Sequence, residues 1–262
     1  MKICRFFHEN VERYGALHDG RIFLLPAAGV SAEGAEKLSL RESFDPAEVE
    51  FLTPTTPTKI VCVGRNYAAH AAELGNEIPS EPLLFLKAPS ALITHGQPIK
   101  LPPQSKQVEH EGELAVVIGR ECRKLTETDD PFSYVFGYTC LNDVTARDLQ
   151  RKDGQFTRAK SFDTFCPIGV FIETELDVSD AAADGEGIRV STRVNGVVKQ
   201  DGRTGQMVFS VGFLIRYISN MMTLKPGDII ATGTPSGVSQ LLAGDDCEVE
   251  IEGVGVLRNP VQ

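Results

Sequence analysis

Two glutamates open an apolar segment in "HEGELAVVIGR", residues 110–120. Glu111 and Glu113 are separated by one residue, and residues 114–118 are apolar and rich in β-branched side chains. Such residues favour a strand, and side chains two apart in a strand point to the same face. We therefore expect the two carboxylates to emerge side by side where a buried strand begins.

A pair of carboxylates needs a partner if it is partly buried. At about 4 Å and an effective dielectric near 20, two such charges repel by about 4 kcal/mol. The pair persists if it shares a proton, flanks a substrate or holds a cation. Glu-x-Glu alone is a weak signal, because in many strands it is only the solvated face.

A third acid strengthens the case for a cation. Asp143 ends the predicted strand "YVFGYTCLND" (residues 134–143), which places it at a sheet rim, where loops build sites. Three carboxylates without a convincing histidine or cysteine cluster predict a hard cation, Mg²⁺ or Mn²⁺, rather than zinc. Such an ion keeps positions open for water or for a bidentate anion.

The residues just downstream are basic. From Val144 to Lys160 there are five basic residues and two acids. The basic residues are Arg147, Arg151, Lys152, Arg158 and Lys160. This segment can be a site for a small anion or merely a solvated loop, and composition leaves both interpretations open.

The whole chain has the composition of a globular protein. It has 262 residues, of which 42% are hydrophobic and 24% charged, and its net charge of −10 argues against a nucleic-acid partner. No apolar run approaches the roughly 20 residues that span a membrane, and the N-terminus lacks a signal-peptide pattern. Six cysteines without a C-x-x-C pair indicate reduced thiols and a cytoplasmic location.

Turn and periodicity signals predict an α+β fold with much sheet. His18-Asp19-Gly20 and Asn195-Gly196 are typical of hairpin turns. The Thr/Pro segment 53–59 predicts an extended linker between a small N-terminal β-rich domain (1–55) and a larger domain (56–262). "RNYAAHAAELG" predicts a short helix ending near Gly75, and apolar spacing predicts an amphipathic helix from about Ser210 to Met222.

Six stretches, in order, resemble the fumarylacetoacetate hydrolase (FAH) family. They are "VGRNYAAHAAE", "PLLFLKAPSAL", "HEGELAVVIG", "GYTCLNDVTARDLQ", "AKSFDTFCPIG" and "LKPGDIIATGTPSGV", and the resemblance covers residues 58–260. The members of the family that the chain resembles are bacterial, acylpyruvase-like proteins, which carry a small, variable N-terminal domain. The resemblance implies a β-rich fold with mixed sheets rolled around a metal site, a cytoplasmic homodimer and a role in aromatic catabolism.

The resemblance also implies roles for single residues. Glu111, Glu113 and Asp143 would bind Mg²⁺ or Mn²⁺, the same three residues that the charge argument selects. His70 would activate water and Glu73 orient it on a segment that closes as a lid, although without the resemblance a surface histidine is the better interpretation. Lys160 would stabilise negative charge beside the metal. Thr164 would support the metal through water, and the substrate would contact Arg65, Tyr67, Arg147, Gln150 and Thr234.

The implied reaction is hydrolysis of a C–C bond in a 2,4-diketo acid, such as an acylpyruvate or fumarylpyruvate, to give pyruvate or a related acid. An oxaloacetate-type decarboxylase and a 2-hydroxyhepta-2,4-diene-1,7-dioate-type isomerase share the same enolate. The His70–Glu73 pair favours hydrolysis, because a water-activating pair is idle in simple tautomerisation. A non-catalytic, metal-dependent binding protein is the alternative from another class, and it would have no need of His70.

Overall fold

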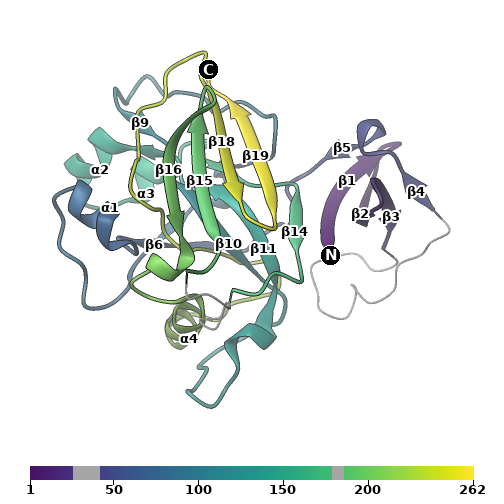
Figure 1. The fold of residues 1–262 in the computed structure, drawn as a ribbon, viewed down its shortest axis with the longest axis horizontal. Helices are drawn as coiled ribbons and strands as arrows, with labels where there is room; N and C mark the ends of the chain where they lie inside the picture. Colours follow the sequence, from purple (N-terminus) through teal and green to yellow (C-terminus); the bar gives the residue numbers. More distant parts are fainter. Residues whose placement is uncertain (26–41, 179–185) are drawn as a thin grey trace.

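The computed structural model describes residues 1–25, 42–178 and 186–262. Strands dominate, and they form a long mixed sheet and a smaller antiparallel sheet, with few helices (Figure 1). The predicted α+β class is confirmed. No helix among these residues is long and apolar enough to cross a membrane.

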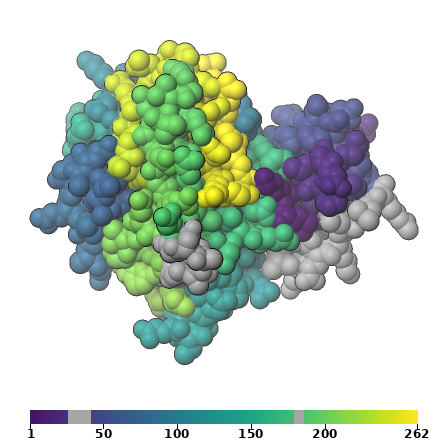
Figure 2. All heavy atoms as spheres, in the orientation of Figure 1, coloured from purple at the N-terminus to yellow at the C-terminus, as the bar shows by residue number. Residues whose placement is uncertain are grey.

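The N-terminal strands form a lobe beside the main body (Figures 1 and 2). They are β1 (Lys2–His8), β2 (Val11–His18), β3 (Arg21–Leu24), β4 (Ser43–Phe44) and β5 (Glu50–Phe51), with a 3₁₀ helix, η1 (Pro46–Glu48). The first predicted hairpin is confirmed: Asp19 and Gly20 have φ of 45° and 76°, as a two-residue turn requires. β1 also pairs with β14 (Phe171–Glu173), so this lobe continues the main sheet.

The segment after the lobe, residues 52–59, contains neither helix nor strand, and it is fastened to the body. The Thr55 hydroxyl donates to the Gly227 carbonyl at 2.9 Å. The buried carboxylate of Asp228 accepts from the backbone N–H groups of Thr58 and Lys59. The segment therefore fixes the start of the next strand in place.

The main sheet positions the acidic residues. Its body contains β6 (Ile60–Gly64), β7 (Leu83–Lys87), β10 (Gly112–Ile118), β11 (Val135–Asn142) and β17 (Ile229–Ala231). β10 lies between β11 and β17, antiparallel to both, and each of its residues is buried. Burial on both faces explains why the sequence of this strand is continuously apolar after its first residues.

The second sheet packs over β10 and β11 (Figure 1). Its order is β16-β15-β18-β19, formed by β15 (Arg189–Val194), β16 (Val197–Arg203), β18 (Asp246–Ile251) and β19 (Gly255–Pro260). Asn195 and Gly196 form the predicted turn between β15 and β16, with φ of 53° and 77°. Leu114 and Val116 of β10 share one core with Val190 and Val249 of this sheet.

Four helices complete the described part of the chain. They are α1 (Ala68–Glu73), α2 (Arg147–Asp153), α3 (Thr157–Lys160) and α4 (Val211–Met221). α4 matches the predicted amphipathic helix: Ser210 accepts from the Phe213 N–H, and Leu214, Ile215 and Ile218 are buried. The basic segment is helical rather than a loop, because α2 and α3 occupy most of it, with Gly154 ending α2 in the left-handed conformation.

Short elements fill the connections. They are η2 (Pro89–Ala91), β8 (Leu92–Ile93), β9 (Val108–Glu109), η3 (Pro131–Tyr134), β12 (Thr145–Ala146), β13 (Cys166–Pro167) and η4 (Thr204–Gln206). β9 pairs with β12, which brings Glu109 close to the start of α2.

Candidate active site

Three buried carboxylates meet where β10 begins and β11 ends. Gly112 of β10 pairs with Asn142 of β11, so Glu111 and Glu113 lie beside Asp143. The side chains are exposed by only 4%, 2% and 0%, and one oxygen of each lies within 4.8 Å of the others. The structure thus brings together the three residues that the sequence selects as metal ligands.

Backbone and amide groups fix these carboxylates. The Asn142 side chain accepts from the Glu111 N–H at 2.9 Å, and the Asp143 N–H donates to the Glu111 carbonyl at 2.8 Å. The Gly233 N–H donates to the Glu113 carboxylate at 2.8 Å. Gly233 has a φ of 100°, and a Cβ here would lie 2.8 Å from the Asn66 Cβ. Glycine therefore allows this loop to reach Glu113.

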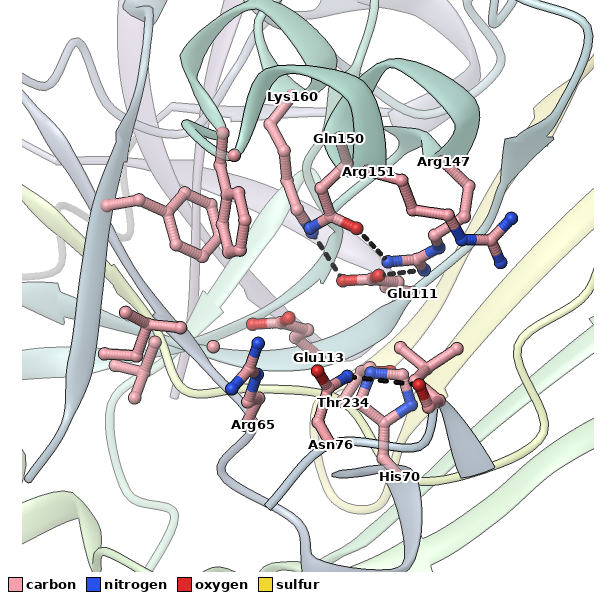
Figure 3. Close-up of a pocket in the computed structure, with 17 residues that line it drawn as sticks. Arg65, His70, Asn76, Glu111, Glu113, Arg147, Gln150, Arg151, Lys160 and Thr234 are labelled. Atoms are coloured by element: carbon pink, nitrogen blue, oxygen red, sulfur yellow. Dashed lines mark hydrogen bonds and ion pairs between the residues drawn. The ribbon is translucent and has the colours of Figure 1, made fainter. Parts of the chain in front are cut away.

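Two buried lysines hold Asp143. Lys160 Nζ bridges Asp143 and Glu111, 2.6 Å from an oxygen of each. Figure 3 shows its bond to Glu111. Lys87 Nζ donates to the other oxygen of Asp143, also at 2.6 Å. Sequence reasoning missed Lys87, although a lysine that ends the apolar strand "LLFLK" was a usable signal.

The guanidinium of Arg147 makes hydrogen bonds to three other side chains. Its Nε donates to Glu109 at 2.8 Å, its Nη2 to Glu111, and its Nη1 to the side-chain oxygen of Gln150 at 2.6 Å. These bonds make Arg147 a residue that orients Glu111. It also lines the cavity, and its contact with a substrate stays a prediction. Because Arg147 takes the oxygen of Gln150, the amide NH₂ of Gln150 is the group left to face the cavity.

Burial and charge set the ionisation of the two glutamates in opposite directions. Burial raises the pKa of Glu111, but Lys160 and Arg147 more than offset it, so its pKa lies below the ordinary value. Burial, with the charges of Asp143 and Glu111, raises the pKa of Glu113 well above its ordinary value. Glu113 accepts a backbone N–H but no cation within the described residues. With Glu109 counted, four buried carboxylates face three buried cations, Lys87, Arg147 and Lys160, so the site lacks one positive charge. Its hard oxygen donors suit a divalent ion such as Mg²⁺ or Mn²⁺.

A cavity of 420 Å³ opens onto Glu111 and Glu113, whereas Asp143 is not part of its lining. Figure 3 shows polar side chains from several elements turned toward it, among them Arg65, His70, Gln150, Lys160 and Thr234. Another part of its lining is apolar, where Phe85 and Phe156 pack edge to face with ring centroids 5.3 Å apart. Such a volume with a few convergent polar groups suits a small-molecule ligand.

His70 is buried in this lining, so the surface interpretation is wrong. Its Nδ1 lies 3.4 Å from a carboxylate oxygen of Glu73, one turn along α1. Burial lowers the pKa of His70, against the opposing effect of Glu111. A neutral imidazole that donates from Nδ1 to Glu73 keeps Nε2 as a base. Both Glu73 oxygens lie 3.1 Å from the Gly237 nitrogen, so the loop that fixes Glu113 also fixes Glu73.

Thr234 connects the cavity to the second sheet. Its hydroxyl donates to the Gly112 carbonyl at 2.8 Å and accepts from the Gln200 amide at 2.7 Å. The oxygen of Gln200 accepts from the Gly112 N–H at 3.0 Å. Gln200, on β16, therefore supports both the glutamate pair and Thr234. Sequence reasoning missed Gln200, because nothing in a polar strand marks one glutamine as buried.

Two other residues do not take the places expected from the resemblance. The Tyr67 ring is buried and does not line the cavity, and its hydroxyl has no hydrogen-bond partner among the described residues. Thr164 also lies outside the cavity lining, and its hydroxyl accepts from the Lys100 N–H at 2.9 Å. Neither Tyr67 nor Thr164 therefore contributes to the cavity wall.

The family model described as fumarylacetoacetate (FAA) hydrolase C-terminal matches residues 59–262. The chain belongs to this family. A second model, described as Rv2993c-like N-terminal, matches residues 1–54. The resemblance seen in the six sequence stretches is thus confirmed, and the FAH part carries every carboxylate, lysine and arginine described above.

Similar proteins carry several activity names. Oxaloacetate tautomerase Fahd2a from Rattus norvegicus is 43% identical, over 82% of this chain and 70% of its own. Oxaloacetate tautomerase YisK from Bacillus subtilis is 41% identical, over 79% and 71%.

Two solved structures share the fold along their whole length. The 5-carboxymethyl-2-hydroxymuconate delta-isomerase from Mycobacterium smegmatis is 38% identical, with a TM-score of 0.87, over 100% of this chain and 99% of that one. The fumarylacetoacetate hydrolase from Exiguobacterium antarcticum is 36% identical, with a TM-score of 0.86 and the same coverage.

Proposed function

We propose that the protein is a divalent-metal-dependent enzyme that forms or uses the enolate of a small 2-oxo acid. Keto–enol tautomerisation is the reaction that we favour. One observation carries the proposal: Glu111 and Glu113, which form a buried carboxylate cluster with Asp143, line the same cavity as a neutral histidine. The carboxylates provide a site for a cation, and the histidine provides a base.

Glu111, Glu113 and Asp143 would hold the ion, Mg²⁺ or Mn²⁺. When bound, the ion would draw electrons from the 2-oxo group of the substrate and make the neighbouring C–H bond more acidic. Lys87 and Lys160 keep Asp143 in place, and Arg147 does the same for Glu111. Lys160 also presents positive charge to the cavity, where negative charge develops on the substrate oxygen.

His70 is the base in this mechanism. Its Nε2 removes a proton from C3 of the 2-oxo acid, and the electron pair of that C–H bond forms the C2–C3 double bond. The imidazolium then returns the proton to the oxygen on C2, which gives the enol without a further reactant. Glu73 stabilises the imidazolium and keeps the ring oriented.

The relatives and the chemistry of the pair support tautomerisation. Two relatives above 40% identity are named oxaloacetate tautomerases, and a similar solved structure is named an isomerase. Moving a proton between carbon and oxygen needs a base as much as activating water does. The sequence argument took the His70–Glu73 pair as a reason to favour hydrolysis, but the pair suits both reactions equally.

Hydrolysis of a 2,4-diketo acid is the second candidate. His70 faces the cavity and can also deprotonate water, which would attack the C4 carbonyl and release the enolate of pyruvate with a second carboxylic acid. A similar solved structure is named a fumarylacetoacetate hydrolase. Decarboxylation of oxaloacetate would reach the same enolate.

A metal-controlled assay separates these reactions. The protein is treated with EDTA and assayed with and without Mg²⁺ or Mn²⁺ on enol-oxaloacetate and on acetylpyruvate. We expect a metal-dependent relaxation of the oxaloacetate enol absorbance while total oxaloacetate stays constant. Release of acetate and pyruvate from acetylpyruvate would identify the hydrolase instead, and pyruvate from oxaloacetate the decarboxylase.

The His70→Ala variant completes the assay, because its metal site is intact. It should bind metal and lose the catalysed rate. If the wild-type protein changes none of these compounds in either metal, the enzyme proposal is wrong and a non-catalytic metal-dependent binding protein is the better description.

A further inference from the structure

Two arginines that line the cavity are not paired with a carboxylate. Within the described residues, Lys87, Lys160 and Arg147 all make ion pairs with the acidic cluster, whereas Arg65 and Arg151 make none. Arg151 follows Arg147 by one turn of α2, so both lie on the same face of the helix. Its guanidinium is therefore available to a ligand.

A chain of hydrogen bonds holds Arg151 at the cavity. Its Nη1 donates to the side-chain oxygen of Gln107 at 3.2 Å. The amide nitrogen of Gln107 donates to Glu109 at 2.6 Å, and Glu109 also accepts from Arg147. This arrangement turns the Gln107 oxygen toward Arg151 and leaves the other N–H groups of that guanidinium for a partner.

The charges around the cavity favour a dianion. The buried carboxylates Glu109, Glu111, Glu113 and Asp143 outnumber the buried cations by one, and a divalent ion reverses that balance. Arg65 and Arg151 then add two positive charges that no carboxylate of the described chain neutralises. A 2-oxo dicarboxylic acid carries two negative charges, so it complements the loaded cavity better than a monoanion.

We propose that Arg151 binds the distal carboxylate of a 2-oxo dicarboxylic acid and selects such acids over those with an apolar end. The inference rests on the proposed function. In the view of Figure 3, Arg65 and Arg151 lie on opposite sides of Glu111. The two cations thus flank the carboxylates, one for each end of the ligand. The competing interpretation is an apolar end packed against Phe85 and Phe156.

A matched pair of ligands tests the proposal. 2-Oxoglutarate and 2-oxopentanoate have the same chain length and differ in a distal carboxylate or methyl group. Binding of each to the Mg²⁺-loaded protein is measured by calorimetry. The wild type should bind 2-oxoglutarate more tightly, and Arg151→Met should reduce that affinity about tenfold or more, while 2-oxopentanoate binding stays unchanged.

The neighbouring cation provides the control. Lys152 is exposed and does not line the cavity, so Lys152→Met makes the same charge change and should leave the selectivity unchanged. Arg151→Lys should keep part of the preference. Arg151 is exposed, so each variant should unfold at the wild-type temperature.

The outcomes separate this inference from the proposed function. Equal losses for both ligands, or no loss in Arg151→Met, would overturn the role of Arg151 while metal-dependent turnover of 2-oxo acids still supported the function. A wild type that binds neither ligand and converts no 2-oxo acid would overturn both. A preference for 2-oxopentanoate would assign the far end of the ligand to the aromatic wall.

Discussion

Asp143 illustrates how a single residue is held for chemistry. Lys87 binds one of its oxygens and Lys160 the other, and all three side chains are buried. A carboxylate held from both sides cannot rotate away when a cation leaves. Removing one partner of such a buried pair leaves an unpaired charge, which costs more than the pair itself contributes.

Lys87→Met should therefore be strongly destabilising. We expect the free energy of unfolding to fall by about 3 kcal/mol, because Asp143 loses one of its two partners in a dry environment. Urea denaturation measures the change. Lys100→Met, at an exposed position, is the control and should fall within about 0.5 kcal/mol of the wild type. Equal stability of the two variants would show that Lys87 does not balance Asp143.

The titration of His70 predicts the pH dependence of the reaction. Burial lowers its pKa below the ordinary 6.5, so the imidazole is neutral and basic above that lowered pKa and becomes protonated as the pH falls through it. We expect kcat/KM to be constant near pH 7 and to fall on the acid side, with an apparent pKa below 6.5. The pH profile measures it, and an acid limb above pH 7 would contradict the assignment.

At the scale of elements, one loop connects the parts of the site. Residues 232–239 follow β17 and supply the Gly233 N–H to Glu113, the Thr234 hydroxyl to the cavity and the Gly237 N–H to Glu73. Gln200 of β16 holds the same loop through Thr234. Glu113, a proposed metal ligand, and Glu73, the partner of the proposed base, are therefore positioned by a shared backbone, although one comes from a strand and the other from a helix.

Gly237→Ala tests this connection. The residue has a φ of 101°, and an added Cβ would lie 1.9 Å from the Lys199 carbonyl oxygen, so the loop must move and Glu73 loses its N–H partner. Gly244→Ala is a matched control, with a φ of 94° but nothing within 4 Å. Both should lose about 1–2 kcal/mol of stability from the positive φ, and Gly237→Ala should lose more because of the clash. The kcat should fall about tenfold or more only in Gly237→Ala. Equal kcat values would show that the loop does not position Glu73.

Local signals explain what the sequence could predict. Strict i, i+2 spacing and a strand end placed Glu111, Glu113 and Asp143, and turn residues placed the two hairpins. The periodicity of residues 211–222 gave α4 to within a residue. Gln200, Glu109 and the buried state of Lys87 depend on which distant strands pack together, and no local pattern encodes that pairing. The ion pairs of Arg147 with Glu109 and Glu111 could not be predicted for the same reason.

At the scale of the whole molecule, the two sheets share a core around the start of β10. The second sheet covers β10 and β11 (Figure 1). Residues of α1 and α2 line the cavity. Glu111, Glu113 and Asp143 come together only when β10 and β11 pair. An ion that binds these three carboxylates would therefore stabilise the folded chain and not the unfolded one.

Metal removal should thus lower thermal stability. At a Mg²⁺ concentration 100 times its Kd, the folded state gains about 2.7 kcal/mol, which corresponds to a rise of about 5–10 °C in Tm over EDTA-treated protein. Differential scanning fluorimetry measures the shift. Glu113→Gln removes one ligand and should abolish most of it, and a full shift in that variant would place the ion elsewhere.

Because β1 pairs with β14, the N-terminal region (1–54) and the FAH region (59–262) share backbone hydrogen bonds, and expressing one without the other would break them. The pairing joins Lys2, Ile3 and Cys4 to residues 171–173, and β14 contacts β11 through a single registered pair, Tyr138 with Glu173. A polypeptide trimmed to residues 59–262 would leave one side of β14 with unsatisfied backbone groups, the kind of open border at which proteins self-associate. The catalytic region should therefore precipitate or oligomerise when expressed without its first strands, even though none of them touches the cavity.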